Sequence, residues 1–343
     1  MDSGDVRVAV VGSGANGASI GADLIDAGVD VTLIEQWPAH VEAMRRDGLT
    51  IHMPDRDLTV RPHAIHLCEV AELRHPFDVV LIVMKAYDTR WAAELVAPLL
   101  AGDGVMAAVQ NGMTTEAVAA AVSAERAVGT VIEISATMTD PGVVHRHTAP
   151  GRSWFAVDAT PRADIVADLL TRSGRVERFE DIGSAKWMKL VSNASVLVPT
   201  ACLGMPMLDA LDEPGMKEAM IAAGREALAV GRARGHRPLP IFGLTEADLG
   251  AADSLVETML AVLYDRFVVA GATTTVLQDW RKGRRSEVDD VNGIVVSEGR
   301  RLGIPSPANR AIVELAHRIE RGELSPGPEN ARLLGPSGIS SRR

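Results

Sequence analysis

A glycine-rich segment near the N-terminus constrains the fold more than any other feature of this sequence. Gly12-Ser13-Gly14-Ala15-Asn16-Gly17 directly follows the apolar run at residues 6–11, and apolar residues recur at helical spacing over 15–27. A second apolar run occupies residues 29–34. The segment therefore lies at the turn from a strand to a helix in a β-α-β unit, which is typical of an open sheet of parallel strands.

The glycines of this segment are spaced as a pyrophosphate-binding turn requires. Gly12 permits the tight turn, Gly14 lets the backbone approach a phosphate closely, and Gly17 lets the helix pack near the strand. The helix N-terminus itself attracts negative charge. This context predicts a dinucleotide-binding loop, and the alternative is that the glycines only shape a turn.

An acidic residue ends the second strand of this unit. Glu35 lies 23 positions after Gly12, where a carboxylate accepts hydrogen bonds from ribose hydroxyls and repels a 2′-phosphate. The sequence therefore predicts NAD as the cofactor, with NADP less favoured. Two alternatives stay open: Glu35 is a solvated strand end, or Arg45 and Arg46 bend toward a phosphate.

The rest of the chain divides into an α/β part and a helical part. Strands are expected at 78–84 and 104–109, helices at 89–100 and 114–121, and further strands between 127 and 179. From about residue 183 helical spacing alone is present, at 185–202, 216–233, 255–269, 288–302 and 308–321. We expect a Rossmann-type, doubly wound parallel sheet at 1–182, an all-helical substrate domain at 183–325 and a loosely ordered tail at 326–343.

Composition excludes several classes of protein. Among 343 residues, 35 Lys and Arg stand against 45 Asp and Glu, so the net charge is −10, which opposes binding to nucleic acid. No apolar run approaches the roughly 18 residues that a membrane-spanning helix needs, and the acidic start lacks the pattern of a signal peptide. We expect a soluble cytoplasmic protein, with a possible homodimer through apolar helices of the second domain.

Metal binding and disulfides are not expected. Cys68 and Cys202 are too few and too far apart for a disulfide framework or a zinc cluster. The histidines are scattered over predicted loops and edge strands, and no acidic ligands lie near His145 and His147.

Five segments in a fixed order carry a family resemblance. They are Lys85-Ala86-Tyr87, Gln110-Asn111-Gly112-Met113, Lys186-Trp187-Met188-Lys189-Leu190-Val191-Ser192-Asn193, Thr274-Thr275-Val276-Leu277-Gln278-Asp279 and Ser286-Glu287-Val288-Asp289-Asp290-Val291-Asn292-Gly293. Together with the glycine loop, they resemble the ketopantoate reductase (2-dehydropantoate 2-reductase) family over residues 6 to about 320. The resemblance implies reversible hydride transfer between nicotinamide and a 2-keto acid or related carbonyl compound, in a cleft between two domains.

The same resemblance implies roles for individual residues. Lys189 matches the catalytic lysine, and Glu287 matches the acid of the family's conserved motif. Asn193 matches a substrate-binding asparagine one turn after Lys189. Thr275 stands where the family usually has a serine, a hydroxyl that would donate to a substrate carboxylate. Asn111 matches a residue near both the substrate and the nicotinamide. The cofactor-binding set becomes Gly12, Ser13, Gly14, Ala15, Asn16, Gly17, Glu35, Lys85 and Asn111.

A lysine on an apolar helix is also chemically suited to this work. Reducing a ketone needs a proton donor at the developing alkoxide, and desolvation brings a lysine pKa toward neutrality. The alternatives are ordinary ones: Lys189 and Lys85 as surface charges, and Glu287 paired with Arg284 or Arg285. Ser286 and Asp289 also have the spacing of a capping box.

One departure from the family bears on the substrate. Leu197 replaces a second substrate-binding asparagine, and a site that loses a polar partner loses preference for the polar substrate. The sequence therefore predicts an NAD-dependent dehydrogenase or reductase for a hydroxy or keto acid other than pantoate. The alternatives are 2-dehydropantoate 2-reductase itself and an NAD-binding sensor without turnover, although a sensor needs only the glycine loop and Glu35.

Overall fold

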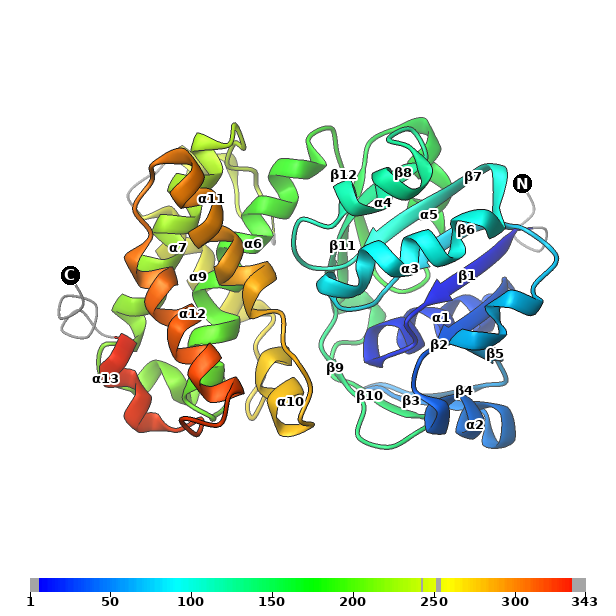
Figure 1. Cartoon of the computed structure of the whole chain (residues 1–343), viewed down its shortest axis with the longest axis horizontal. Coiled ribbons are helices and arrows are strands. Elements are labelled where there is room, and N and C mark those ends of the chain that lie inside the picture. The colour runs from blue at the N-terminus through cyan, green and yellow to red at the C-terminus, as the bar shows by residue number, and fades with distance from the viewer. Residues whose placement is uncertain (1–5, 242, 251–253, 335–343) are drawn as a thin grey trace. The chain divides into compact units, whose positions relative to one another are not determined.

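The computed structural model describes residues 6–241, 243–250 and 254–334 (Figure 1). The chain divides into two compact units, Met1–Ile182 and Gly183–Arg343. Each unit is described below by itself.

The first unit is built on an eight-stranded sheet with the order β12-β11-β8-β7-β6-β1-β2-β5. Its strands are β1 (Arg7–Val11), β2 (Asp30–Glu35), β5 (His63–His66), β6 (Phe77–Ile82), β7 (Leu100–Val109), β8 (Ala127–Glu133), β11 (Trp154–Asp158) and β12 (Arg175–Phe179). All neighbouring strands run parallel except β8 and β11, which are antiparallel. The predicted mostly parallel, Rossmann-type sheet is confirmed.

Helices cover both faces of this sheet because alternate strand residues point to opposite sides. Along β1, Val8 and Val10 belong to a core shared with α1 (Ala15–Asp26), α2 (Pro38–Asp47) and α5 (Asp164–Leu170). Ala9 and Val11 belong to a separate core with α3 (Thr89–Val96) and α4 (Thr115–Val122). Figure 1 shows these helices beside the labelled strands. Continuous apolar strands are therefore buried on both faces, as the sequence predicted.

A second, four-stranded sheet in this unit was not predicted. It has the order β4-β3-β10-β9, from β3 (Leu49–His52), β4 (Asp57–Val60), β9 (Ala136–Thr137) and β10 (Val143–Arg146). Arg146 pairs with Asp23 of α1 at 2.6 Å, and both side chains are almost completely buried. The strands expected in the interval 127–179 are present, but they belong to two sheets and α5 interrupts them.

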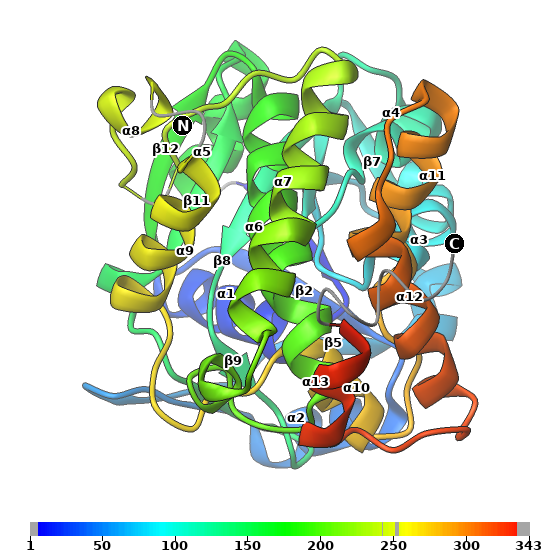
Figure 2. The same cartoon turned by 90° about the vertical axis from the view of Figure 1, so that its left-hand side faces the viewer.

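The described residues of the second unit form helices and connecting loops and no strand, as predicted. Its helices are α6 (Ile182–Cys202), α7 (Met216–Ala233), α8 (Glu246–Gly250), α9 (Leu255–Arg266), α10 (Thr275–Arg281), α11 (Ile294–Leu302), α12 (Pro307–Glu320) and α13 (Ala331–Leu334). Figure 2 shows α6 and α7 side by side. They approach closely because Gly231 of α7 has no side chain. A Cβ there would lie only 2.1 Å from Nε1 of Trp187. That indole instead donates to the carbonyl of Ala227 at 2.9 Å.

Two details of the second unit differ from the prediction. The helix expected at 288–302 begins as a π-helical segment, Asp289–Gly293, before α11. The tail expected to be loosely ordered from 326 contains α13, and Asn330 donates to the carbonyl of Cys202 at 2.9 Å. The remainder of that predicted tail, 335–343, lies outside the described residues.

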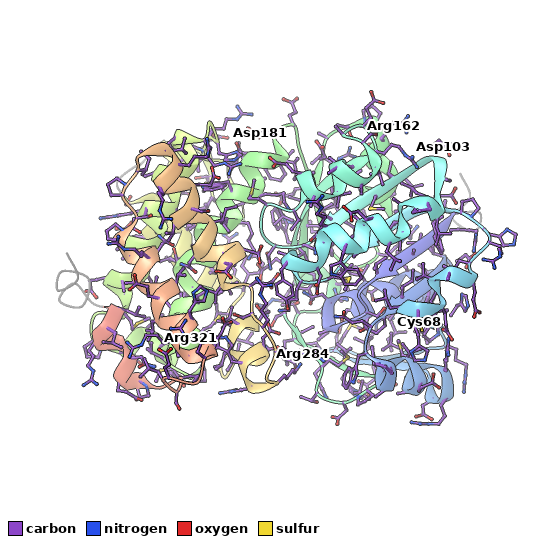
Figure 3. The ribbon with its side chains drawn as sticks, viewed as in Figure 1. Cys68, Asp103, Arg162, Asp181, Arg284 and Arg321 are labelled. Carbon is purple, nitrogen blue, oxygen red and sulfur yellow. The ribbon has the colours of Figure 1, made fainter. Side chains whose placement is uncertain are left out.

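The thiols and the helix lengths add two findings. Cys68 (labelled in Figure 3) is exposed in the first unit and Cys202 is buried at the end of α6, and both are free. Within the described ranges, no helix combines the length and the apolar character needed to cross a bilayer.

Candidate active site

Two glycines of the loop, Gly12 and Gly17, occupy positions where a side chain does not fit. Gly12 has a φ of +90°, and a Cβ there would lie 2.4 Å from Cγ of Met84. A Cβ on Gly17 would lie 2.0 Å from the carbonyl oxygen of Gly12, so the start of α1 packs directly on the turn. Around a Cβ on Gly14, by contrast, no described atom lies within 4 Å. The open side of the loop is therefore at Gly14, where the backbone is accessible to a ligand.

The first-unit residues of the predicted site gather at one edge of the sheet. The order β7-β6-β1-β2 is parallel throughout, so the carboxyl ends of these four strands share an edge. The glycine loop follows β1, Glu35 ends β2, Lys85 follows β6 and Asn111 follows β7. The structure therefore brings to one edge the residues that the sequence predicted to bind the cofactor, although they are far apart in the chain.

Gln110, which no sequence argument singled out for a role, joins two of the loops at this edge. Its Nε2 donates to the carbonyl of Met84 at 2.7 Å, and its Oε1 accepts from the Thr89 hydroxyl at 3.1 Å. Gln110 is 3% exposed. It therefore fixes the loop that carries Lys85 relative to the loop that carries Asn111. Its position, immediately before Asn111 at a strand end, was the available signal.

Several buried polar atoms at this edge have no hydrogen-bond partner among the described residues. They are Oγ of Ser13, Oδ1 of Asn111 and the hydroxyls of Thr114 and Thr115. Buried polar groups in native proteins are nearly always bonded, so such atoms are explained by a ligand or ordered water. These atoms follow β1 and β7, whose carboxyl ends share the edge that carries the accessible Gly14. The residues present therefore fit a polar cofactor such as a dinucleotide.

The environment of Glu35 bears on the choice between NAD and NADP. Glu35 is 6% exposed, and its Oε1 accepts from the backbone N–H of Trp37 at 2.9 Å. Arg45 donates to the carbonyl of Ala64 at 2.9 Å and pairs with Glu69. Arg45 thus lies against β5, the strand beside β2, with its guanidinium engaged by these partners.

Arg46 is engaged in the same way. It pairs with Asp47, the next residue, at 2.6 Å. In the structure, both arginines that the sequence left open as phosphate ligands are paired with acidic residues.

In the second unit, α6 carries the predicted catalytic lysine and two of the predicted substrate-binding residues. Lys189 is 5% exposed and Asn193, one turn later, is 2% exposed. The Nδ2 of Asn193 is buried with no partner among the described residues. Leu197, a further turn along, is half-buried, while all other residues of 184–202 are buried. One line of residues on α6 thus carries the lysine, an unpaired amide and an accessible apolar side chain.

A second buried lysine lies on the same helix. Lys186, which the sequence analysis did not assign a role, is 2% exposed and precedes Lys189 by one turn. Burial lowers the pKa of Lys186 to about 7. Desolvation of a lysine on α6, expected from the apolar sequence, therefore occurs at Lys186.

Two neighbouring threonines at the start of α10 have different surroundings. Thr274 is the N-cap, and its hydroxyl accepts from the backbone N–H of Leu277 at 3.4 Å. Thr275 is half-buried at the next position. Thr274 therefore serves the helix, and the substrate role that the family resemblance implied for Thr275 stays a prediction.

Glu287 lies just before the π-helical segment and is half-buried. The capping-box alternative is wrong, because the Ser286 N–H donates to Glu320 at 3.3 Å and the Asp289 carboxylate contacts His317 at 3.0 Å. Arg285 pairs with Asp289 at 3.6 Å. Burial and the negative charge of Glu287 raise the pKa of Asp290 to about 6.

A buried amide network, missed by the sequence analysis, holds the π-helical segment against α6. Asn292 is fully buried, and its Nδ2 donates to the carbonyl of Ala194 and to Oδ1 of Asn309, both at 2.9 Å. Asn309 in turn donates to Glu226 at 2.8 Å. The segment that follows Glu287 is thereby fixed next to Asn193. The asparagine in an apolar helical pattern was the only signal.

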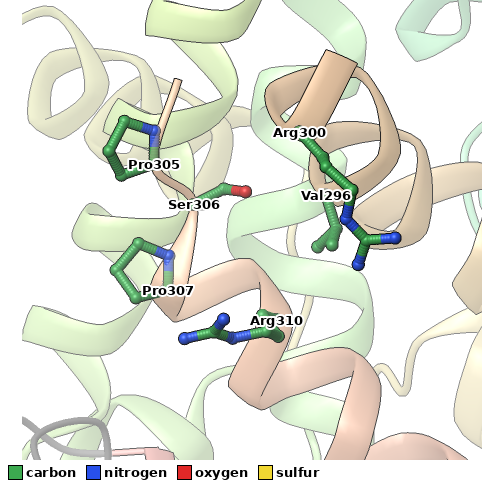
Figure 4. Close-up of a pocket in the computed structure, with 6 residues that line it drawn as sticks. All are labelled: Val296, Arg300, Pro305, Ser306, Pro307 and Arg310. Atoms are coloured by element: carbon green, nitrogen blue, oxygen red, sulfur yellow. The ribbon is translucent and has the colours of Figure 1, made fainter. Parts of the chain in front are cut away.

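Two hollows of the second unit are lined by residues other than the predicted site residues. One hollow is lined by Val296, Arg300, Pro305, Ser306, Pro307 and Arg310 (Figure 4). Another is bordered by Trp280, Arg281, Arg284, Arg285 and Glu320, and Figure 3 labels Arg284. In the described part of the chain, no three His, Cys, Asp or Glu side chains are grouped to hold a metal ion.

Comparisons with known proteins identify the family of the chain. The family model "Ketopantoate reductase PanE/ApbA" matches residues 8–159, and the model of its C-terminal part matches 181–320. A 2-dehydropantoate 2-reductase of Archaeoglobus fulgidus is 28% identical over 324 residues, covering 92% of this chain and 98% of the relative. One from Caulobacter vibrioides is 29% identical over 318 residues, covering 90% and 97%.

Solved structures show the same fold. A PanE/ApbA family ketopantoate reductase from Ralstonia eutropha has a TM-score of 0.77 at 28% identity, covering 93% of this chain and 99% of the other. A D-mandelate dehydrogenase with NADH and anilino(oxo)acetate has a TM-score of 0.81 at 18% identity, covering 92% and 99%. The chain belongs to the ketopantoate reductase family of NAD(P)-dependent oxidoreductases.

Proposed function

We propose that this protein is an NAD-dependent oxidoreductase for a small 2-hydroxy or 2-keto acid, or a related secondary alcohol or ketone, other than ketopantoate. The observation that carries the proposal is the line of residues on α6. A buried lysine, a buried amide with no partner in the described part of the chain, and an accessible leucine follow one another there at one-turn intervals. The lysine is suited to proton transfer and the amide to binding a carbonyl oxygen. The leucine is suited to contact an apolar part of the substrate.

Support for NAD comes from the end of β2. The buried carboxylate of Glu35 occupies the strand end where a ribose hydroxyl is bound in folds of this class. A 2′-phosphate there would face a negative charge, with Arg45 and Arg46 already paired elsewhere. The structurally similar mandelate dehydrogenase carries NADH, so this fold is compatible with that cofactor.

The chain's own residues would perform the steps other than hydride transfer. When bound, the nicotinamide supplies or accepts the hydride. Lys189 would give a proton to the carbonyl oxygen during reduction and take it back during oxidation. Asn193 would orient that oxygen through its free Nδ2, and Thr275 would donate to the substrate carboxylate. Glu287 would orient the substrate or the Lys189 ammonium through a hydrogen bond.

Ketopantoate reduction is the second candidate. Curated relatives across the whole chain are named 2-dehydropantoate 2-reductases. Leu197 argues against this substrate, because an apolar side chain replaces an amide that would bind a hydroxyl. An NAD-binding sensor is the alternative from another class, and retention of Lys189 and Asn193 argues against it.

The test is a panel of 2-hydroxy acids, 2-keto acids and secondary alcohols, including ketopantoate, with NAD(H) and NADP(H), followed at the absorbance of the reduced nicotinamide. We expect turnover with NAD and a substrate other than ketopantoate. In Lys189→Ala, kcat should fall by roughly two to four orders of magnitude while the Kd of NADH changes little.

The neighbouring variant Lys186→Met is the matched control, since it removes another buried lysine from the same helix. It should retain kcat within about tenfold, because proton transfer is assigned to Lys189. Unchanged turnover in Lys189→Ala would refute the assignment. Cofactor binding without turnover of any compound would favour the sensor.

A further inference from the structure

A buried histidine on α2 contacts the glycine loop from behind. His40 is completely buried, and its Nε2 lies 3.0 Å from the carbonyl oxygen of Ser13, in the middle of the Gly12-Ser13-Gly14 turn. Its other ring nitrogen, Nδ1, accepts from the backbone N–H of Gly142 at 2.8 Å. His40 therefore joins the loop to the turn between β9 and β10.

The two partners determine which ring nitrogen carries the proton. The Gly142 backbone has only a hydrogen to offer, so Nδ1 must be the unprotonated nitrogen. In a neutral imidazole the hydrogen then lies on Nε2, which donates to the Ser13 carbonyl. Burial lowers the pKa of His40, which favours this neutral form. His40 is thus a fixed donor aimed at the loop.

The turn that orients His40 is itself firmly held. Gly142 has a φ of +80°, and a Cβ there would lie 3.2 Å from Cβ of Ala43, one turn after His40 on α2. The carbonyl of Gly142 accepts from the backbone N–H of Thr50 in β3 at 2.9 Å. Hydrogen bonds on both sides of this glycine fix the ring, which gives the second sheet a task in the first unit.

The consequence for the loop follows from the planarity of the peptide bond. The peptide between Ser13 and Gly14 is trans, so its C=O and N–H point in opposite directions. With the Ser13 carbonyl directed at His40, the Gly14 N–H is directed away from α2. The α-carbon of Gly14 is the place in the loop where a Cβ would meet nothing within 4 Å. A backbone donor of this kind at a helix N-terminus is what a phosphate oxygen binds.

We propose that His40 is a positioning residue for cofactor binding, which orients the Ser13–Gly14 peptide so that the Gly14 N–H meets the pyrophosphate. This inference rests on the proposed dinucleotide function. It assigns to the second sheet and α2 the part of preorganising the loop before the cofactor arrives.

Two conservative variants separate positioning from ordinary packing. In His40→Gln, the side-chain amide reaches as far as Nε2 and still donates to the Ser13 carbonyl. In His40→Asn, the shorter side chain accepts from Gly142 but does not reach Ser13. Each variant loses one buried hydrogen bond, so we expect similar decreases in melting temperature.

The measurement is the Kd of NADH by fluorescence titration, with steady-state KM and kcat in the same variants. His40→Asn should raise the Kd and the KM of NADH by about tenfold to a hundredfold, with a much smaller effect on kcat. His40→Gln should stay within about threefold of wild type. His52→Asn, which alters a half-buried histidine of β3 that contacts Asp57, is the control and should not change the Kd.

Equal losses of affinity in both His40 variants, or no loss in His40→Asn, would overturn the inference. Failure of the proposed function gives a different result. If wild type binds NADPH and not NADH, only the cofactor choice is wrong, and the same comparison is made with NADPH. If wild type binds neither dinucleotide, both proposals fail.

Discussion

At the scale of single residues, Glu35 is the side chain with the clearest consequence for cofactor choice. Its carboxylate is buried at the end of β2, and both downstream arginines have other partners. We expect Glu35→Arg to lower the ratio of kcat/KM for NAD to that for NADP by at least about tenfold, because repulsion of a 2′-phosphate becomes attraction. Arg45→Gln should leave the ratio unchanged. A wild-type preference for NADP would contradict the argument.

Leu197 is the residue expected to select the substrate. It is the accessible residue among the buried ones of 184–202, at the position where the family resemblance implies an amide. Leu197→Asn should shift the ratio of kcat/KM toward ketopantoate by about 1–3 kcal/mol relative to the best substrate of the panel.

Leu197→Met keeps the site apolar and should preserve the original preference. Efficient reduction of ketopantoate by wild type, unaltered by the asparagine, would show that Leu197 does not meet the substrate. Ketopantoate would then be the preferred assignment.

Burial of the Lys186 ammonium should make the free energy of unfolding depend on pH. Burial lowers its pKa from 10.5 in the unfolded chain to about 7, so between these values the unfolded chain binds the extra proton. The free energy of unfolding should therefore rise with pH from about 7 to 10.5, as far as this group is concerned. Lys186→Met should remove that rise.

The same variant should be more stable at pH 6, where Lys186 is charged within the fold. The gain should be in the usual range of about 1–3 kcal/mol for a buried substitution, measured by urea unfolding at several pH values. Lys217→Met, on the exposed face of α7, is the matched control and should change neither quantity. A less stable Lys186→Met protein at pH 6 would show that the lysine makes a favourable buried contact.

At the scale of elements, the amide network between α6, the π-helical segment and α12 is the feature that the sequence did not reveal. π-helical turns are rare and occur often at functional sites. Here the turn follows Glu287, and Asn292 within it binds the carbonyl of Ala194. The network therefore holds the segment that follows Glu287 against the part of α6 that contains Asn193.

Removing the network should be destabilising and non-additive. We expect Asn292→Ala and Asn309→Ala each to lower the free energy of unfolding by about 1–3 kcal/mol, since each leaves buried groups unpaired. The double variant should lose less than the sum. Asn330→Ala, which removes a buried amide outside the network, should add to either one. Full additivity of Asn292 and Asn309 would mean that they act separately.

At the scale of the whole molecule, the two units differ in what they offer. The first presents an accessible turn and unpaired polar atoms at one sheet edge, and the second a buried lysine and amide on one helix. Among the described residues, Leu95 of α3 is the exposed large apolar side chain, at 39%. The homodimer through helices of the second unit therefore stays a prediction without an apolar patch in its favour.

The sequence by itself determined the parts of this protein that depend on local pattern. Continuous apolar runs, helical spacing and three glycines with fixed tasks defined the parallel sheet, the helical second half and the cofactor loop, because each signal is short in range. Tertiary structure decided what depends on distant partners. It brought Gly142 to His40, Ala194 to Asn292 and Glu320 to Ser286. Burial also singled out Lys186. Such contacts join residues far apart in the chain, and no spacing along one element encodes them.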